Sequence, residues 1–489
     1  MRAAAGLAAL ALCLAGLPPG ARTAGLDAER GGVRAAVEAW AAPQAALAQA
    51  LWDQPELGYL EHGASALLQQ QLRDAGFGIE SGVAGMPTAF VARAGRRGSG
   101  PVIALLAEMD ALPGMSQQAV PMQSPVPGQD AGHACGHNLF GAGAVGAARA
   151  IAQWLAHSGV DGEVRVYGTP AEEGGSGKVF MVRAGLFDDV DVALHWHPGD
   201  SNSAAQSTSL ANISGKFRFR GLASHAAISP ERGRSALDGV EALNHMANLL
   251  REHVPEGTRI HYAITDGGQA PNVVPARAEA YYYVRHHDAE VVREVFGRLH
   301  DAARGAALGT GTEVDFEPLG GVHGLLPNDT LGRVLDRALR AAGGLEYDGD
   351  ELAFARALQD SLQRPGALAS AREVQPYRSD IRGLASTDVG DVSRVVPTAG
   401  LATATWVPGT PAHSWQAVAA SGMSIGQRGA LNAAAALAMA AVELYLRPEL
   451  VDAARAEFDR ARGGTEYRPL LQRAEPPLDY RRPAAGPDA

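Results

Sequence analysis

Cysteine is nearly absent from this chain of 489 residues, which contains only Cys13 and Cys135. Cys13 falls in an N-terminal segment that we expect to be removed, so Cys135 would have no disulfide partner. A single thiol in an exported protein is a liability unless it binds a metal or attacks a substrate. The scarcity of cysteine therefore excludes a disulfide-stabilised fold and makes Cys135 the first candidate functional residue.

Basic residues are also few, with 42 Lys and Arg against 53 Asp and Glu and a formal net charge of −11. Phosphate backbones bind to concentrated basic surfaces, and the chain contains no basic run. We therefore exclude nucleic acid as a partner.

One long hydrophobic run stands out, at the N-terminus, where an apolar stretch from Ala3 to Leu17 follows Arg2 and precedes Pro18. A basic start, a short apolar run and small residues after it are typical of a secretory signal peptide, here residues 1–24. The stretch is too short to span a bilayer, and we expect no association with a membrane. We predict an exported or periplasmic protein. The alternative is a cytoplasmic protein with an alanine-rich N-terminal helix.

Short apolar runs alternate with helical patterns over most of the chain. The runs at 102–107, 163–168, 191–194 and 401–407 predict strands buried on both faces, as in a parallel sheet covered by helices. Between them, in the middle of the chain, the predicted order is β-α-β-β-α-β, which is typical of a ferredoxin-like split βαβ unit. We predict an α/β/α catalytic domain with a mixed sheet at 30–212 and 327–450, an inserted α+β lid domain at 213–326, and a C-terminal tail at 451–489, of which the last two dozen residues are loosely held.

Ionisable residues follow three of the predicted strands. Asp110 follows the first strand, the pair Glu172-Glu173 follows the second, and His195 and His197 follow the third. The carboxyl ends of parallel strands share one edge of a sheet, and function gathers there. We therefore expect these side chains to lie close together.

The segment Asp130-Ala-Gly-His-Ala-Cys-Gly-His-Asn138 combines a thiol and imidazoles with glycine. Cys135 and His137 are suitable ligands for a borderline or soft divalent metal. They are equally compatible with a cysteine nucleophile and a histidine base in a metal-free amidase, and spacing alone does not choose. The Glu172-Glu173 pair favours a metal, because one carboxylate can bind an ion while its neighbour exchanges protons with a water.

Three further candidates are histidines close to the predicted strand ends. Residues two apart on a strand face the same way, so His195 and His197 could both reach the site. We predict that one is a ligand and that the other supports it or faces the substrate. His413 follows the last predicted strand and is a candidate final ligand.

The predicted lid contributes three more candidates. Arg285 ends a strand and could clamp a substrate carboxylate with two hydrogen bonds. His225 and Asn272 could donate to a carbonyl oxygen as it becomes an oxyanion, and Asn272 could also contact the bound substrate.

The motifs together resemble the M20 metallopeptidases, in particular the branch of N-acyl amino acid amidohydrolases and, within it, the group of p-aminobenzoyl-glutamate hydrolase B subunits. The resemblance extends over roughly residues 35–446. It rests on His133–Asn138, Pro170–Gly175, Leu194–Pro198, Ser386–Gly390 and Pro411–Trp415.

This resemblance implies two divalent metal ions, manganese or zinc, in each subunit. The implied ligands are Cys135, as a bridge between the ions, and His137, Glu173, His195 and His413. Glu172 is implied as the general acid/base and Asp110 as a support behind the ligands, which leaves His197 to face the substrate.

The resemblance also implies an activity and an assembly. The expected reaction is hydrolysis of the amide bond of N-acyl or N-aroyl amino acids resembling p-aminobenzoyl-glutamate. The alternatives are a dipeptidase or carboxypeptidase of the same family and, in a different class, a non-catalytic exported protein that binds acyl amino acids. We expect a homodimer formed through the lid, with His225 reaching the neighbouring active site. A heteromer with a paralogous subunit is the alternative.

Overall fold

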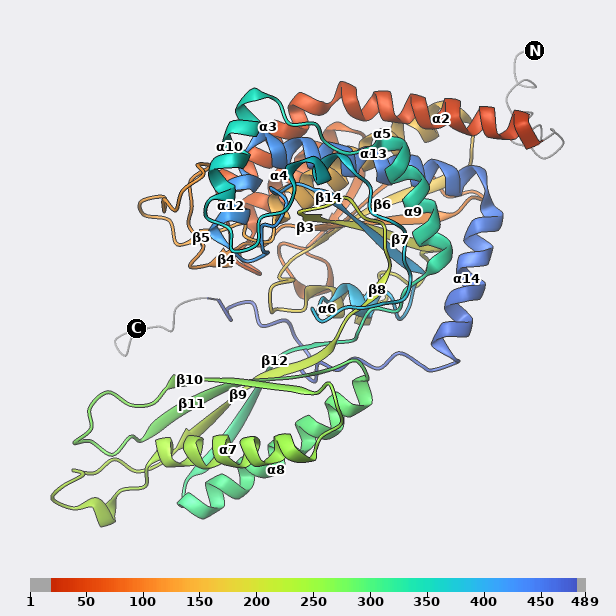
Figure 1. Ribbon diagram of the computed structural model, residues 1–489. Coiled ribbons are helices and arrows are strands. Elements are labelled where there is room, and N and C mark those ends of the chain that lie inside the picture. The colour runs from red at the N-terminus through yellow and green to blue at the C-terminus, as the bar shows by residue number, and fades with distance from the viewer. Residues whose placement is uncertain (1–18, 482–489) are drawn as a thin grey trace.

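The computed structural model describes residues 19–481, which form two units (Figure 1). The larger unit is built from both the N-terminal and the C-terminal parts of the chain, and the smaller unit is inserted between them. The predicted α/β/α domain with an inserted α+β lid is confirmed. Most of the predicted signal peptide lies outside the described residues.

A six-stranded mixed sheet forms the centre of the larger unit, in the order β1-β2-β6-β3-β7-β14. Strands β6, β3, β7 and β14 run parallel, whereas β1 and β2 pair antiparallel at one edge. Strand β3 is buried along its whole length, which explains its continuous apolar sequence. The bounds are β1 Gly78–Ser81, β2 Phe90–Arg96, β3 Val102–Glu108, β6 Gly162–Thr169, β7 Val192–Gly199 and β14 Thr398–Ala404.

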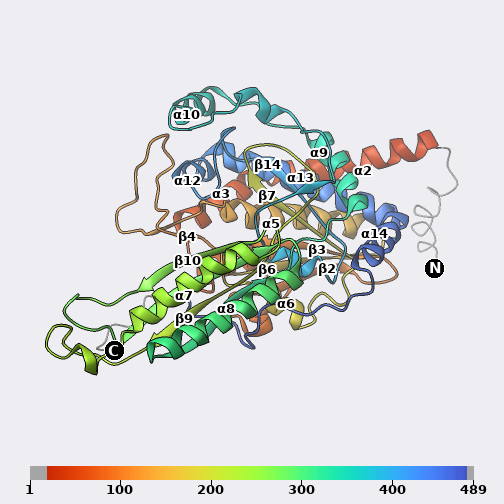
Figure 2. The same cartoon turned by 60° about the horizontal axis from the view of Figure 1, so that its bottom comes forward.

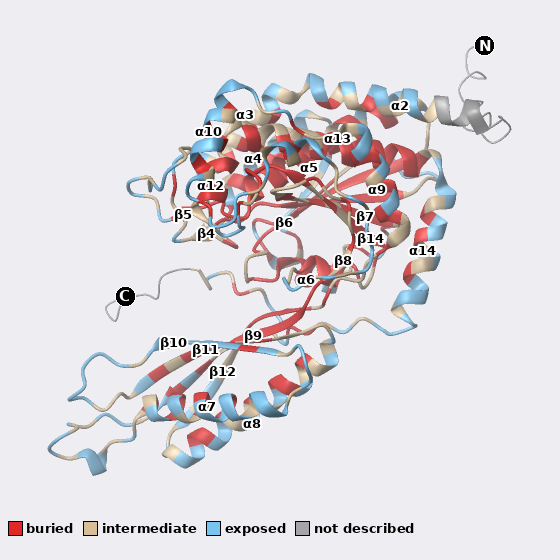
Figure 3. Ribbon diagram, viewed as in Figure 1, coloured by how far each residue is buried: buried red, intermediate tan, exposed pale blue. Residues whose placement is uncertain are grey.

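Two long helices, α5 (His137–Ser158) and α13 (Ser424–Leu446), pack together and cover one face of this sheet (Figure 1). Both are long and apolar enough to cross a membrane by length and composition alone, but most of each helix is buried within the protein. Buried residues concentrate along the sheet and these helices (Figure 3). Their apolar composition is therefore that of core helices.

The other helices of the larger unit surround this core, with α6 on the opposite side of the sheet (Figure 1). Their bounds are α2 Pro19–Ala39, α3 Ala41–Asp53, α4 His62–Asp74, α6 Gly177–Arg183, α9 Asp329–Ala342, α10 Gly349–Gln359, α11 Val389–Val392, α12 Trp415–Ser421 and α14 Pro448–Arg462. Two short strand pairs complete the unit, β4 Leu112–Pro113 with β5 Ala131–Gly132 and β8 Ser207–Thr208 with β13 Ile381–Arg382.

The smaller unit is a four-stranded antiparallel sheet in the order β10-β11-β9-β12, with two helices on one face. Figure 2 shows α7 and α8 side by side across this sheet. The chain order β-α-β-β-α-β is the predicted one. The bounds are β9 Ala211–Arg220, α7 Ala236–Leu250, β10 Arg259–Asp266, β11 Arg277–His286, α8 Ala289–Thr310 and β12 Glu313–Val322.

The predicted C-terminal tail begins within a helix, and the prediction that its last two dozen residues are loosely held is wrong for the described part of them. Residues up to Arg462 continue helix α14, whose Phe458 is buried. Beyond it, Leu470 is buried in the core of the lid and Leu471 in the core of the larger unit. The proline- and arginine-rich composition suggested a solvated segment, but two leucines are enough to anchor it.

Candidate metal centre

Four of the five predicted ligands, together with His197 in place of His195, come from four chain segments that meet at the carboxyl edge of the parallel strands. Cys135 and His137 lie at the start of α5, Glu173 lies in the turn after β6, His197 lies near the end of β7, and His413 follows β14. The prediction that these strand ends converge is thus met by the geometry.

The N-terminus of α5 presents Cys135 and His137 together because Gly136 separates them. Gly136 has φ +75°, and a Cβ at this position would lie 2.7 Å from Pro198. Only glycine fits both the left-handed backbone and the close approach to β7. The sequence Cys-Gly-His therefore folds so that the thiol and the imidazole reach the same space.

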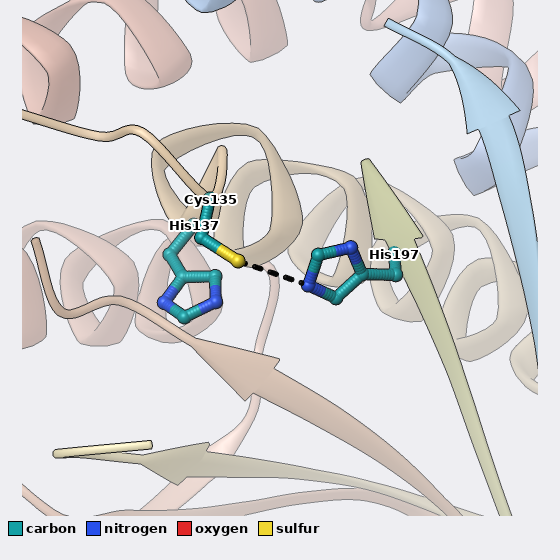
Figure 4. Close-up of side chains that lie close together, drawn as sticks. All are labelled: Cys135, His137 and His197. Atoms are coloured by element: carbon teal, nitrogen blue, oxygen red, sulfur yellow. Dashed lines mark hydrogen bonds between the residues drawn. The ribbon is translucent and has the colours of Figure 1, made fainter. Parts of the chain in front are cut away.

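Two sets of three donors share the Cys135 thiol. Within each set the ligand atoms lie within 4.8 Å of one another, and the sets are Cys135, His137, His197 and Cys135, Glu173, His413. Figure 4 shows the first set, in which Cys135 Sγ lies 3.4 Å from His197 Nε2. In the second set, His413 Nε2 lies 3.2 Å from Glu173 Oε1. A thiolate shared between two such sets is suited to bridge two ions.

The donor atoms fit a metal ion by a second criterion. His137 Nε2 and Glu173 Oε1 are buried and form no hydrogen bond of normal geometry among the described residues, although His137 Nε2 lies 3.1 Å from Glu108 Oε2 and Glu173 Oε1 lies 3.2 Å from His413 Nε2. Buried polar atoms normally form well-aligned hydrogen bonds, and a bound ion would satisfy both atoms. Both atoms face the donor sets described above.

Asp110 orients ligands from both sets. Its Oδ1 lies 3.0 Å from His137 Nδ1, which leaves Nε2 of that imidazole facing the site. Its Oδ2 accepts a hydrogen bond of 2.9 Å from the backbone N–H of Glu173. Burial raises the pKa of Asp110, but the contact with His137 outweighs this effect and holds the pKa below its ordinary value. A carboxylate behind a ligating histidine fixes the ring and its tautomer.

The sequence predicts that His195 is the ligand on this strand and that His197 faces the substrate, but the geometry favours His197 as the ligand. His197 lies beside Cys135, whereas His195 belongs to neither donor set. His195 lies opposite Gly400 of β14 and lines a separate cavity of about 270 Å³. Two residues of strand correspond to about 6.6 Å, which takes His195 away from the strand end. Alternation placed both histidines on one face but could not fix how far along β7 the site lies.

Glu172 lies beside a buried group of charges. A carboxylate oxygen of Glu172, one of Glu108 and a ring nitrogen of His137 lie within 4.8 Å of one another. Burial, followed by the charges of Glu108 and Glu173, raises the pKa of Glu172 well above its ordinary value. A carboxyl group with a raised pKa can both accept and return a proton near neutral pH.

The sequence did not predict a role for Lys178, whose ammonium neutralises the buried carboxylates beside Glu172. Its ammonium lies 2.7 Å from Glu108 Oε1 and 2.7 Å from Asp388 Oδ1, and all three side chains are buried. Burial raises the pKa of Glu108, but the charges of Lys178 and His137 outweigh it and hold that pKa well below its usual range. Lysine is rarely buried, so nothing in its sequence position predicted this role.

The Cys135 thiol does not have the environment of a free nucleophile. Burial and the charge of Glu173 raise its pKa well above the ordinary value. Reactive cysteines have lowered pKa values, so the geometry disfavours the metal-free cysteine amidase.

The predicted lid residues are not metal-ligand candidates in this structure. His225 and Asn272 are exposed, and the two segments that carry them meet at the His225–Val273 bridge. His225 belongs to neither donor set. Arg285 lies on β11, with its guanidinium 5.1 Å above the ring of Tyr283, and its buried Nε has no hydrogen-bond partner among the described residues.

Comparison with known proteins agrees with this geometry. Residues 104–361 match the peptidase family M20/M25/M40. The chain is 41% identical to the B subunit of p-aminobenzoyl-glutamate hydrolase of Escherichia coli over 86% of this chain and 93% of that protein. It is 32% identical to the Xaa-Arg dipeptidase of Mus musculus over 84% of this chain and 88% of that protein.

A solved structure shows the same fold. A dinuclear metal binding peptidase of the M20 family from Bacillus subtilis superposes with a TM-score of 0.53 at 20% identity, over 83% of this chain and 99% of that one. At this identity the likeness concerns the fold alone, whereas the relatives above establish the family. The chain therefore belongs to peptidase family M20/M25/M40 and is a metal-dependent hydrolase of amide bonds.

Proposed function

We propose that this enzyme hydrolyses the amide bond of N-acyl or N-aroyl amino acids resembling p-aminobenzoyl-glutamate, with Glu172 as general acid/base. The observation that carries the proposal is the pair of donor sets sharing Cys135, with the Glu172 carboxyl beside them. The substrate class is supported by the 41% identity to one subunit of a p-aminobenzoyl-glutamate hydrolase.

The ligand assignment follows from the two donor sets. Cys135, His137 and His197 would hold one divalent ion, and Cys135, Glu173 and His413 would hold the other. Manganese or zinc suits a set of thiolate, imidazole and carboxylate. When bound, the ions would polarise the scissile carbonyl and acidify a water.

The protein's own groups then handle the proton and the substrate. Glu172 takes a proton from the attacking water and delivers it to the leaving amine, a task that suits its raised pKa. Asp110 keeps the His137 ring and the Glu173 turn in place. We propose that Arg285 binds the substrate carboxylate, because its buried Nε lacks a partner among the described residues.

Turnover tests the activity. Metal-stripped protein is resupplied with manganese or zinc and assayed against aroyl- and acyl-amino acids and against short dipeptides. We expect aroyl-amino acids to be cleaved and Glu172→Gln to lower kcat by about 10²–10⁴-fold while both ions remain bound. Glu80→Gln, at an exposed surface glutamate of the same domain, is the control and should retain activity. Substantial turnover by Glu172→Gln would overturn the role of Glu172. Exclusive cleavage of dipeptides would favour the second candidate, a dipeptidase, which the similarity to the Xaa-Arg dipeptidase supports.

We propose that His225 and Asn272 serve the active site of a second subunit docked through the lid. Both are exposed, and neither reaches the donor sets of its own chain. The edge strand β10 and helix α7 of the lid expose apolar residues suited to such contact, Met246, Leu249, Tyr262 and Ile264. Since the E. coli relative is named as one of several subunits, the partner could be a paralogous chain rather than a second copy.

Mixing two inactive variants tests this sharing. His225→Ala and Glu172→Gln homodimers should both be impaired, and a mixed dimer should regain activity because one of its two sites contains both native residues. Failure of the mixture to regain activity, with mixed dimers demonstrated by mass, would exclude sharing between copies.

A further inference from the structure

The C-terminal segment after helix α14 runs back between the two units (Figure 1), and its last described residue, Arg481, contacts Glu173 of the metal centre. Leu470 is buried in the lid core and Leu471 in the core of the larger unit. Arg473 Nη1 lies 3.2 Å from Glu317 Oε1 on β12, and Arg183 donates to the Arg473 carbonyl. These contacts fix the path of the segment on both units before it reaches Tyr480 and Arg481.

The turn that carries Glu172 and Glu173 has an unusual backbone. Ala171 has φ +57° and Ser176 has φ +58°, in the left-handed region that favours glycine. Strained residues of this kind persist only where the surroundings fix them, and they concentrate at functional sites. The position of the Glu172 and Glu173 side chains therefore depends on what holds this turn.

Three of the groups that hold the turn come from the N-terminal part of the chain. The Ala171 N–H donates to Glu61 at 2.8 Å, the Glu173 N–H donates to Asp110 at 2.9 Å, and the Gly175 carbonyl accepts from Tyr59 at 2.6 Å. Each of these partners is buried.

The fourth group comes from the other end of the chain. Arg481 Nη2 donates to the Glu173 carbonyl at 2.5 Å, and the Arg481 guanidinium lies 4.9 Å above the Tyr480 ring. The Tyr480 ring meets the Tyr59 ring edge-on at 5.7 Å, so it also backs the residue that holds Gly175. The segment thus contacts the turn directly and through Tyr59.

The approach is close enough to restrict the local sequence. A Cβ on Gly58 would lie 2.5 Å from the Tyr480 hydroxyl, too close for a larger residue to fit without displacing that side chain. Among the described residues Arg481 has no carboxylate within ion-pairing distance. The guanidinium is therefore held by its hydrogen bond to the turn and by its contact with the Tyr480 side chain.

We propose that Arg481 is a positioning residue for the catalytic turn and that the C-terminal segment completes the active site of this enzyme. This inference rests on the proposed role of Glu172 and Glu173 described above. Arg481 acts on the reaction through the Glu173 carbonyl: it holds the Glu173–Gly174 peptide, which directly follows the general acid/base and the adjoining ligand. Small displacements of such groups can lower rates by about 10²-fold.

The test compares Arg481→Gln, Arg481→Lys and, as a control in the same segment, Arg468→Gln, whose side chain is exposed. All are assayed at saturating metal. We expect Arg481→Gln to lower kcat by about 10–100-fold with KM changed less than about threefold, and Arg481→Lys to recover part of the loss. Arg468→Gln should match the wild type. A rise in KM confined to substrates with a free carboxylate would overturn the proposal, because Arg481 would then bind substrate.

A second readout does not depend on turnover. Hydrogen exchange of a peptide covering Ala171–Ser176 reports whether the turn is held, since the Glu173, Gly174 and Gly175 amides are hydrogen-bonded. Exchange should be faster in Arg481→Gln than in the wild type and unchanged in Arg468→Gln. Equal exchange in all three proteins would overturn the proposal even if the enzyme's substrate proved different. If exchange is faster in Arg481→Gln but neither the wild type nor the variants cleave acyl amino acids, the positioning role stands and the proposed function is wrong.

Discussion

Replacing the buried Lys178 by methionine tests the charge balance behind the metal centre. The Lys178 ammonium contacts Glu108 and Asp388 at 2.7 Å each, and the three side chains are 0%, 2% and 0% exposed. At an effective dielectric of about 20, each contact has a Coulomb attraction of about 6 kcal/mol, most of which offsets the cost of burying the charges. Lys178→Met removes the attraction and leaves the carboxylates buried without it.

The net loss of folding stability is the cost of leaving buried carboxylates without a compensating positive charge. We expect Lys178→Met to lower the free energy of unfolding by about 3–5 kcal/mol at pH 7. Burial already raises the pKa of Asp388 with the ammonium present, and without the ammonium the pKa of Glu108 rises above the unfolded value as well. A carboxyl group with a raised pKa stabilises the fold at low pH and loses that contribution as the pH rises. The loss should therefore be smaller at pH 5, by up to about 2.7 kcal/mol for one proton taken up.

Denaturant unfolding of metal-free protein, followed by tryptophan fluorescence, measures this loss. All six tryptophans belong to the larger domain, so the signal reports its unfolding without the lid. Arg97→Met is the control, because the Arg97 side chain is 59% exposed and its ion pair with Asp189 should contribute less than about 1 kcal/mol. A Lys178→Met loss within about 1 kcal/mol of the control, or one that does not shrink at pH 5, would refute the reasoning.

Two further predictions concern the ligand correction and a buried carboxyl. His197→Ala should lose one bound ion and lower kcat sharply, whereas His195→Ala should keep both ions. Metal analysis after gel filtration counts the bound ions. The reverse pattern would show that His195 is the ligand. Asp391 accepts hydrogen bonds from the His323 N–H and the Tyr467 hydroxyl, and burial raises its pKa to about 7. Its contribution to stability is present below about pH 4 and is lost as the pH rises through 7, so the stability of the wild type relative to Asp391→Asn should fall between pH 4 and 8; a constant difference would contradict the shift.

The convergence of strand ends was predictable because parallel strands place their carboxyl ends at one edge. That rule places Asp110, the glutamate pair and the histidines of β7 at one site without knowledge of any contact. It does not choose between His195 and His197, which share a face of the strand. The choice depends on how far β7 extends past the start of α5, and this is set by packing between Gly136 and Pro198.

Lys178 and Arg481 were beyond prediction for opposite reasons. Lysine is normally a surface residue, but Lys178 is buried because Glu108 and Asp388, from other parts of the chain, neutralise its charge. Arg481 lies in a segment whose proline and arginine content indicates solvation, and it is brought to the site by the anchoring of Leu470 and Leu471. The residues next to Lys178 and Arg481 in the sequence do not indicate which groups these side chains contact in the fold.

The arrangement of supports makes the two donor sets interdependent. Cys135 belongs to both sets, and Asp110 fixes His137 in one and the Glu173 backbone in the other. Groups that hold the Cys135 thiol and the Glu173 turn in place for one ion therefore reduce the conformational entropy that is lost when the second ion binds. His413 differs from the other donors, since its side chain is 50% exposed and its own backbone has φ +56°. Because the His413 N–H donates to the carbonyl of Ala134, the residue before the shared thiol, a fixed Cys135 loop also helps to order His413 in the second set.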